Sequence, residues 1–347
     1  MIQGETKTEA QYRAIYLDSS SSLKDFSMDR KKYHKKYILN QVVEDEESKA
    51  ATTGRLVETL LMEPHLFDEK FHISTCMSTP TAMMLDFVEA LYKHTVEATA
   101  EDGVVTRSFE DMCKDAHAES GFKIGLDAVL KKFIGSDAEV YYKEIREVRP
   151  KHLTVVAAQE IANAEKIVIE LKTNPTTAEI VNLVNDVQYS VHNQLQVEGY
   201  DVLDHKFKSM MDKVVVDHAN KKVQVYDLKC TWSVENFYNE YYLYRRAYIQ
   251  GFLYHKAAES WASEMGYGDY KILHPKFIVC DSTNYMNPLI YAMSDINMVD
   301  ARAGFEHKGR EYPGVEQLIG DLKWTLENDV WNISRENHIN NGIVNLD

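Results

Sequence analysis

Residues 206–230, KFKSMMDKVVVDHANKKVQVYDLKC, contain two valine-rich runs separated by the short polar segment DHANKK. Runs of this kind are typical of β-strands, and a polar segment of this length is typical of the turn between them. We therefore predict a β-hairpin whose turn is centred between Ala219 and Asn220. A slip of one residue would turn its apolar side chains to the opposite face, so the hydrophobic pattern specifies the register. This register places four valines on one face: Val214, Val216, Val223 and Val225.

Charged residues continue the same face of the predicted hairpin. The register places Asp212 directly across from Asp227, with Cβ atoms about 5 Å apart, and Lys229 projects from that face too. Two carboxylates so close repel each other and need compensation from Lys229, a divalent cation or both. Carboxylate oxygens suit Mg²⁺ or Mn²⁺. The alternative is a surface salt bridge between Lys229 and one aspartate, and the hairpin alone leaves both interpretations open.

Two segments that read as helices add polar side chains. Glu58 lies in GRLVETLLM, and a carboxylate on an otherwise apolar helix seldom stays buried unless it is paired or bound to metal. Gln250 and Tyr254 lie one turn apart in RRAYIQGFLYH, on one face of a helix. Taken alone, Glu58 also fits the edge of a helix, and the Gln250–Tyr254 pair also fits core packing with one polar contact.

The rest of the chain reads as helices around a small sheet. Ser22 is a candidate N-cap for an amphipathic helix with Leu23, Phe26 and Tyr33 on its apolar side. Further helices are expected at 53–62 (ending near Pro64), in much of 80–190 (including 79–98 and 153–172), at 234–261 and at 315–331, and further strands at 276–281 and 289–295. Helix-rich flanks around a small mixed sheet predict an α/β or α+β protein.

Composition limits the class of protein. The chain has 347 residues, of which 44% are hydrophobic, enough for one large domain or two smaller ones. It has no signal-peptide pattern, no apolar run long enough to span a membrane and no CxxC pair among its four cysteines, so we expect a cytoplasmic protein without a zinc or iron–sulfur site. The net charge of −15 does not favour nucleic acid, although residues 24–36 are locally basic.

Together, Asp212, the triplet Asp227-Leu228-Lys229 and the pair Gln250-x-x-x-Tyr254 resemble the PD-(D/E)XK nuclease superfamily with its RecB-type QxxxY motif. More narrowly, the chain resembles phage exonucleases related to RecE and λ exonuclease. Three islands support this likeness and cover about a third of the chain: SSSSLKDFSMDRKKYH, GRLVETLLMEPHLFDEKF and KSMMDKVVVDHANKKVQVYDLKC.

The sequence departs from that family's pattern at two places. Glu58 stands where RecE-like members have histidine, although λ exonuclease and several relatives use glutamate there. Met211 precedes Asp212 in place of the proline of the superfamily name. The cysteine quartet of the iron–sulfur members is absent as well.

The resemblance implies roles for these residues. Asp212, Asp227, the main-chain carbonyl of Leu228 and Glu58 would hold Mg²⁺, or Mn²⁺. Lys229 would position or help to deprotonate the attacking water and steady charge on the scissile phosphate. Gln250 and Tyr254 would support the hairpin or touch the DNA backbone, and Arg30 and Ser22 would contact a 5′-phosphate or the entering duplex.

The resemblance also implies an activity and a domain organisation. We expect a single nuclease domain over 1–347, with N-terminal helices (1–75), a mainly helical insertion (76–195) and a part containing the catalytic sheet, the QxxxY helix and C-terminal helices (196–347). The implied activity is a Mg²⁺-dependent exonuclease that acts on ends of double-stranded DNA, 5′→3′, as a ring-shaped homo-oligomer that passes single strands to an annealing protein. Two alternatives remain: a non-catalytic protein that binds DNA or a partner, and an endonuclease of the same superfamily.

Overall fold

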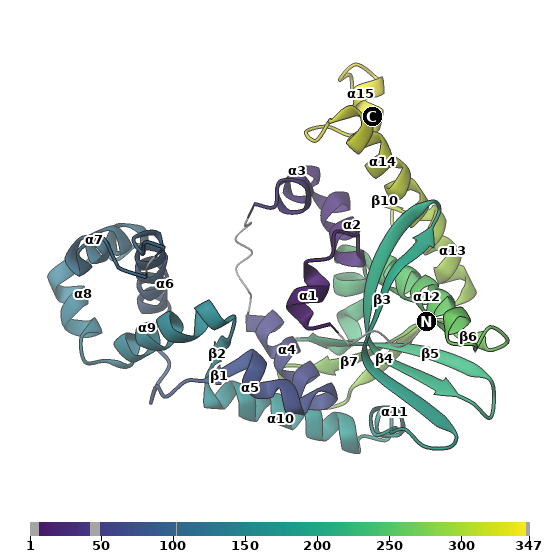
Figure 1. Ribbon diagram of the computed structural model, residues 1–347, viewed down its shortest axis with the longest axis horizontal. Coiled ribbons are helices and arrows are strands. Elements are labelled where there is room, and N and C mark those ends of the chain that lie inside the picture. The colour runs from purple at the N-terminus through teal and green to yellow at the C-terminus, as the bar shows by residue number, and fades with distance from the viewer. Residues whose placement is uncertain (1–6, 42–48, 102, 345–347) are drawn as a thin grey trace. The chain divides into compact units, whose positions relative to one another are not determined.

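The computed structural model describes residues 7–41, 49–101 and 103–344. The chain divides into two compact units, one formed by residues 1–62 and 166–347 and the other by residues 63–165. The first unit contains a mixed β-sheet with helices beside it, and the second is mainly helical (Figure 1). A mixed sheet flanked by helices confirms the predicted α/β fold class.

The sheet of the first unit has the strand order β3-β4-β5-β7-β8, and β6 pairs with β5. Antiparallel pairs join β3 to β4, β4 to β5 and β7 to β8, whereas β5 runs parallel to β7 and β6. The bounds are β3 Tyr189–Val202, β4 His205–Asp217, β5 Lys222–Thr231, β6 Lys271–Ile272, β7 Lys276–Asp281 and β8 Leu289–Ala292. The predicted strand at 276–281 is confirmed, and the strand predicted at 289–295 forms but ends at Ala292.

The hairpin β4–β5 has the predicted register. Val214 pairs with Val225 and Val216 with Val223, and the ladder ends at the pair Lys213–Tyr226, one step before Asp212 and Asp227. All four valines are fully buried in one apolar cluster with residues of α12 (Ala247–Glu264). The face that the valines define is therefore the face on which α12 packs.

Helix α12 lies close to the sheet because of a glycine. A Cβ atom at Gly251 would come within 2.3 Å of the Sδ atom of Met293 and 3.3 Å of the Phe277 ring. A larger residue there would displace the Met293 side chain, and the preceding residue, Gln250, contacts Asp227 of β5. Helix α4 (Lys49–Met62) contacts β4 and β5 and ends before Pro64, as predicted.

The N-terminal helix differs from its prediction. Helix α2 spans Ser20–Met28, and its N-cap is Ser19, whose side chain accepts from the Ser22 amide while the Ser22 hydroxyl accepts from the Ser19 amide. The prediction of Ser22 as N-cap is wrong because the capping box uses it as the third helical residue. Asp29 then ends α2 in an extended conformation and caps α3 (Arg30–Tyr33). The predicted apolar residues Leu23, Phe26 and Tyr33 are buried.

Three other expectations are corrected. The aromatic segment 234–261 is not one helix, because Arg246 adopts a left-handed conformation (φ 55°) between a π-helix, Tyr238–Tyr244, and α12. Strand β3 begins at Tyr189, inside the range expected to be a helical insertion. The β-branched run Thr154–Val156 forms strand β2, and helix α10 begins only at Ala158.

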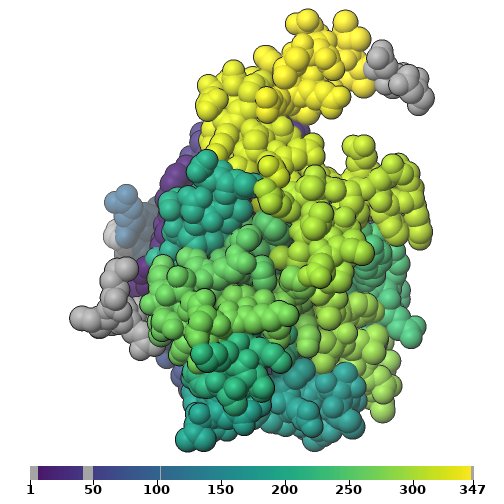
Figure 2. Space-filling view, turned by 90° about the vertical axis from the view of Figure 1, so that its right-hand side faces the viewer, coloured from purple at the N-terminus to yellow at the C-terminus, as the bar shows by residue number. Residues whose placement is uncertain are grey.

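The C-terminal segment of the first unit comprises three helices and a hairpin. Figure 2 shows residues of this segment, in yellow, beside the end of the β3–β4 hairpin, in teal. The Lys323 ammonium donates to the Leu203 carbonyl at the turn between β3 and β4, at 3.0 Å. The bounds in the first unit not yet given are α1 Glu9–Arg13, α11 Ala178–Val181, α13 Asp295–Ala303, β9 Gly304–His307, β10 Arg310–Pro313, α14 Val315–Asn328 and α15 Arg335–Ile339.

The second unit has its own apolar core, built mainly on α6 to α9. Its elements are α5 Phe67–Lys70, β1 Phe71–Ile73, α6 Ala82–Glu97, α7 Phe109–Glu119, α8 Leu126–Phe133, α9 Asp137–Val148 and β2, which pairs in parallel with β1; helix α10, Ala158–Thr173, runs on from this unit into the first. Across the described ranges, every helix is too short or too polar to cross a bilayer.

Candidate active site

Two buried carboxylates lie where the β4–β5 ladder ends. Asp212 on β4 accepts a hydrogen bond through Oδ2 from the Leu228 amide at 2.7 Å. Asp227 on β5 has only 1% of its surface exposed, and its Oδ1 accepts from Nε2 of Gln250 at 2.8 Å. Burial, followed by the negative charges of Asp227 and Glu58, raises the pKa of Asp212 well above its ordinary value. The sequence-based expectation that the two aspartates lie close together is thus met.

The Lys229 ammonium forms an ion pair with Oδ2 of Asp227. Its Nζ atom is 2.6 Å from Oδ2 of Asp227, and the exposed fraction of its side chain is 21%. Burial by itself would lower the pKa of the ammonium, but the charges of Asp227 and Asp212 outweigh it and raise the pKa. Lys229 is therefore a cation at neutral pH. Its ion pair with Asp227 is largely buried, unlike the surface salt bridge considered as an alternative.

Gln250 connects the helix α12 to this pair. Its Nε2 donates to Asp227 and also to the Tyr254 hydroxyl at 2.9 Å, and that hydroxyl donates to the Met210 carbonyl of β4 at 2.7 Å. The two residues one turn apart therefore bind both strands of the hairpin. They therefore join Asp227 of β5 to the main chain of β4.

Glu58 reaches the cluster from helix α4. Its Oε1 accepts from Nε2 of Gln194 at 2.6 Å, and its charge contributes to the raised pKa values of Asp212 and Lys229. Gln194 lies opposite Asp212 in the β3–β4 register, in a left-handed conformation (φ 50°). Sequence analysis missed Gln194, because no sequence signal marks a glutamine that leaves the regular strand conformation.

Lys24 is a second residue that sequence analysis counted only as part of a basic stretch. Its ammonium donates to Oε1 of Gln250 at 3.4 Å, on the opposite side of that amide from Asp227. Burial and the nearby Lys229 charge lower its pKa to about 8, and the charge of Asp227 opposes this shift. Lys24 thus adds a second cation to the site.

The structure does not bring Arg30 or Ser22 to this cluster. The Arg30 guanidinium pairs with Asp321 of α14 at 3.7 Å and lies over the Phe26 ring. The Ser22 hydroxyl is buried, donates to Asp18 at 2.7 Å and completes the helix cap. Both side chains are therefore engaged with other residues of the first unit, Arg30 with Asp321 and Ser22 with Asp18 and Ser19.

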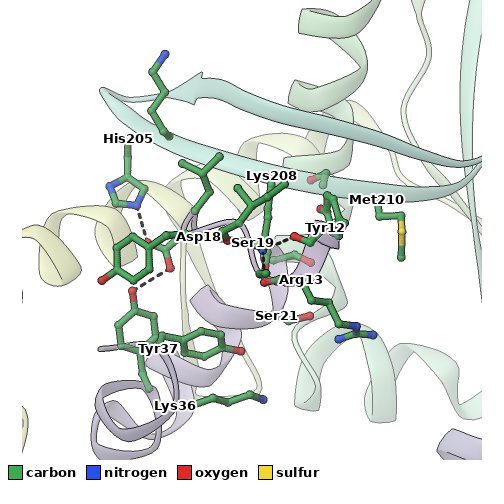
Figure 3. A pocket seen from close by; sticks show the side chains of 18 of the residues that line it. Tyr12, Arg13, Asp18, Ser19, Ser21, Lys36, Tyr37, His205, Lys208 and Met210 are labelled. Atoms are coloured by element: carbon green, nitrogen blue, oxygen red, sulfur yellow. Dashed lines mark hydrogen bonds and ion pairs between the residues drawn. The ribbon is translucent and has the colours of Figure 1, made fainter. Parts of the chain in front are cut away.

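Two cavities adjoin the cluster. One of about 200 Å³ is lined by Gly54, Arg55, Glu58, Lys229, Cys230 and Arg245, among others. The other, of about 790 Å³, is lined by Arg13, Ser20, Ser21, Lys36, Lys206 and Tyr254, among others. In Figure 3 the side chains of Arg13 and Lys36 extend toward the open space near Ser21. Tyr254 links this larger cavity to Gln250 and the carboxylates.

Two of the oxygen atoms expected to bind a metal ion lie close to the Lys229 ammonium. Oδ2 of Asp227 is buried and accepts no hydrogen bond from the described residues, so its only close partner is the Lys229 ammonium. The Leu228 carbonyl accepts from the same ammonium at 3.5 Å. Within the described ranges, no three acidic, histidine or cysteine side chains form a preassembled metal site. Carboxylate and carbonyl oxygens are the ligands that a hard divalent cation prefers. Such a cation would compete with Lys229 for Asp227.

Comparison with known proteins supports the fold. No family model and no curated protein matches the sequence. Among solved structures, the chain is similar to a crystal structure of a protein from Eubacterium rectale named "putative exonuclease", with a TM-score of 0.50 over 99% of this chain and 96% of that chain. The two sequences are 13% identical, so the similarity concerns the fold. The chain therefore shares the fold of a protein that bears an exonuclease name.

Proposed function

We propose that the protein is a metal-dependent deoxyribonuclease that degrades one strand of linear double-stranded DNA from an end, in the 5′→3′ direction. The observation that supports this most strongly is the cluster of two buried aspartates and Lys229 at the end of the hairpin, with Asp227 held between Gln250 and Lys229. The exonuclease name of the structural neighbour and the motif resemblance support the same class of activity.

Asp212, Asp227, the Leu228 carbonyl and Glu58 are the groups that would hold the cation. A Mg²⁺ or Mn²⁺ ion there would lower the pKa of a bound water and neutralise charge on the phosphate. The high pKa of Asp212 supports this assignment, because a cation removes the repulsion that makes its ionised form unfavourable.

Lys229 would act on the phosphate as a cation. Since its pKa is raised, its ammonium holds its proton at neutral pH and is poorly suited to accept one from water. We infer that it donates hydrogen bonds to the scissile phosphate and orients the attacking water. Charge stabilisation of this kind in a poorly solvated site is commonly worth about 10²–10³ in rate.

The DNA end would enter through the larger cavity. Arg13, Lys36 and Lys206 line it, each beside a carboxylate partner, and Ser20 and Ser21 add hydroxyl groups. A terminal phosphate that competes with those carboxylates would find both charge and hydrogen-bond donors. We propose this cavity in place of Arg30 and Ser22 as the contact with the 5′-phosphate. The acidic side chains that give the net charge of −15 would then lie on surfaces outside the path of the DNA.

The deciding experiment is release of nucleotides from linear 5′-phosphorylated duplex DNA in Mg²⁺, with closed circular DNA alongside. We expect release from the linear substrate alone, with loss of release in Lys229→Ala. Cutting of the circle would indicate an endonuclease instead. A preference for 5′-phosphorylated over 5′-hydroxyl ends would support the assigned direction, and labelled 3′ ends released first would contradict it.

A non-catalytic DNA-binding protein is the second candidate. The observation that favours it is that Lys229 already neutralises Asp227 and that the described acidic residues form no three-ligand group. Binding of duplex DNA by folded protein, without hydrolysis in Mg²⁺ or Mn²⁺, would support this candidate. We also propose a homo-oligomeric ring and an annealing partner for the exonuclease; light scattering that gives a strict monomer would count against the ring.

A further inference from the structure

Two cysteines lie face to face beside the candidate active site. Cys230 on β5 and Cys280 on β7 are directly paired in the parallel ladder, and their Sγ atoms are 2.9 Å apart. Both are free thiols. A separation this short lies between a disulfide bond, at about 2.05 Å, and an ordinary non-bonded contact.

The strand pairing favours a bond between these two residues. Paired strands lie about 4.7–4.9 Å apart, within the range of about 4.4–6.8 Å between Cα atoms that a disulfide allows. The sulfur atoms therefore need to approach by only about 0.9 Å, starting from 2.9 Å, to form a bond. Side-chain rotation can supply this approach without a change in strand register.

The two thiols differ in access. Cys230 is half-buried and lines the cavity of about 200 Å³ that also contains Lys229. Cys280 is 2% exposed, and its contact with Cys230, together with burial, raises its pKa well above the ordinary value. A small oxidant would therefore reach the more exposed Cys230 first, and the Sγ atom of Cys280 lies 2.9 Å away from it.

We propose that Cys230 and Cys280 form a reversible disulfide when the protein meets a hydroperoxide. Cys230 attacks the peroxide, so that the O–O bond breaks, a sulfenic acid forms and water or an alcohol leaves. The Cys280 sulfur then attacks the sulfenic sulfur, so that the S–S bond forms, the S–O bond breaks and a second molecule of water leaves. Two thiols are oxidised and one peroxide is reduced.

The disulfide would also change the surroundings of Lys229. The Cys280 thiol now donates to the Lys229 carbonyl at 3.4 Å, and the Tyr241 hydroxyl donates to the Cys230 carbonyl at 2.8 Å. Oxidation removes the first of these hydrogen bonds and moves Cys230, the residue directly after Lys229. This consequence rests on the proposed nuclease function, whereas formation of the bond does not.

The test uses the full chain, treated with hydrogen peroxide, quenched and measured by intact mass and peptide mapping. We expect a mass lower by two hydrogens and one cross-linked peptide pair containing Cys230 and Cys280, both reversed by dithiothreitol. Cys113 is fully buried and belongs to the other unit, so Cys113→Ser is the matched control and should still form the bond. Cys280→Ala should not form it, and Cys230→Ala provides a second variant if Cys280→Ala fails to fold.

The activity arm is run on the same samples. We expect nuclease activity of the wild type to fall several-fold with the same time course as the mass change and to return with dithiothreitol, while Cys280→Ala keeps its activity in peroxide. Four free thiols after treatment, a stable sulfenic acid at Cys230 or a bond to another cysteine would overturn the proposal. A reversible Cys230–Cys280 bond in a protein without nuclease activity under any condition would uphold the dithiol site and reject the proposed function.

Discussion

The Lys229 ammonium lies 2.6 Å from Oδ2 of Asp227, a buried oxygen that accepts no hydrogen bond from the described residues. The same lysine is needed by the proposed chemistry to bind a phosphate, and the same oxygen is needed to bind a cation. The ion pair therefore keeps both groups in place in the absence of ligands. If metal and phosphate bind together, Asp227 would pair with the cation and Lys229 with the phosphate.

Asp212→Asn should stabilise the protein while abolishing nuclease activity. The raised pKa of Asp212 means that its folded state binds a proton more tightly than its unfolded state, so its contribution to stability is present at low pH and is lost as pH rises through the raised pKa. Above the raised pKa the charged form is a cost that asparagine removes. We expect Tm to rise by about a few degrees in metal-free buffer. The exposed Asp201→Asn is the control, and an unchanged or lower Tm for Asp212→Asn would count against repulsion in the site.

Added Mg²⁺ should raise the Tm of the wild-type protein, because a ligand that binds only the folded state stabilises it. Asp227→Asn should show little or no rise, since it removes the carboxylate that is shared by the cation and Lys229. Differential scanning fluorimetry over a series of Mg²⁺ concentrations, without DNA, measures this separately from catalysis. An equal rise in wild type and variant would place the ion elsewhere.

Gln250→Leu should lower kcat by about tenfold or more and reduce stability by about 1–3 kcal/mol. The change leaves Oδ1 of Asp227 without its donor, and a buried acceptor without a partner costs about this much. Gln224→Leu, another buried glutamine of the same sheet that donates to main-chain carbonyls, controls for the general loss of a buried amide. Denaturant unfolding and single-turnover kinetics give the two readouts. Equal kinetic effects in both variants would contradict a positioning role for Gln250.

Lys24 should make the activity depend on pH near 8. Because its pKa is lowered to about 8, its ammonium loses the proton as pH rises above that value, and any phosphate contact that it makes is lost. We expect the kcat/KM of the wild type to fall above pH 8, Lys24→Arg to move this fall to higher pH and Lys24→Met to be roughly tenfold less active already at pH 7. A pH profile that is the same in all three proteins would exclude contact between Lys24 and the substrate.

The sequence by itself determined the local part of the site. The valine pattern of residues 206–230 fixed the hairpin and its register, since a shift of one residue would expose Val214 and Val216, and that register placed Asp212, Asp227 and Lys229 on one face. The helical spacing of Gln250 and Tyr254 likewise placed both on the face that meets the hairpin.

Only the tertiary structure decided which distant side chains complete the site. Gln194 faces Glu58 through a left-handed conformation within β3, and Lys24 meets Gln250 through the packing of α2 on α12. The charge of Arg30, read from the sequence, likewise gave no sign of its partner Asp321 on α14. The physical reason is one of range: periodic burial encodes which face a residue occupies within its own element, whereas contacts between elements depend on how whole surfaces pack together.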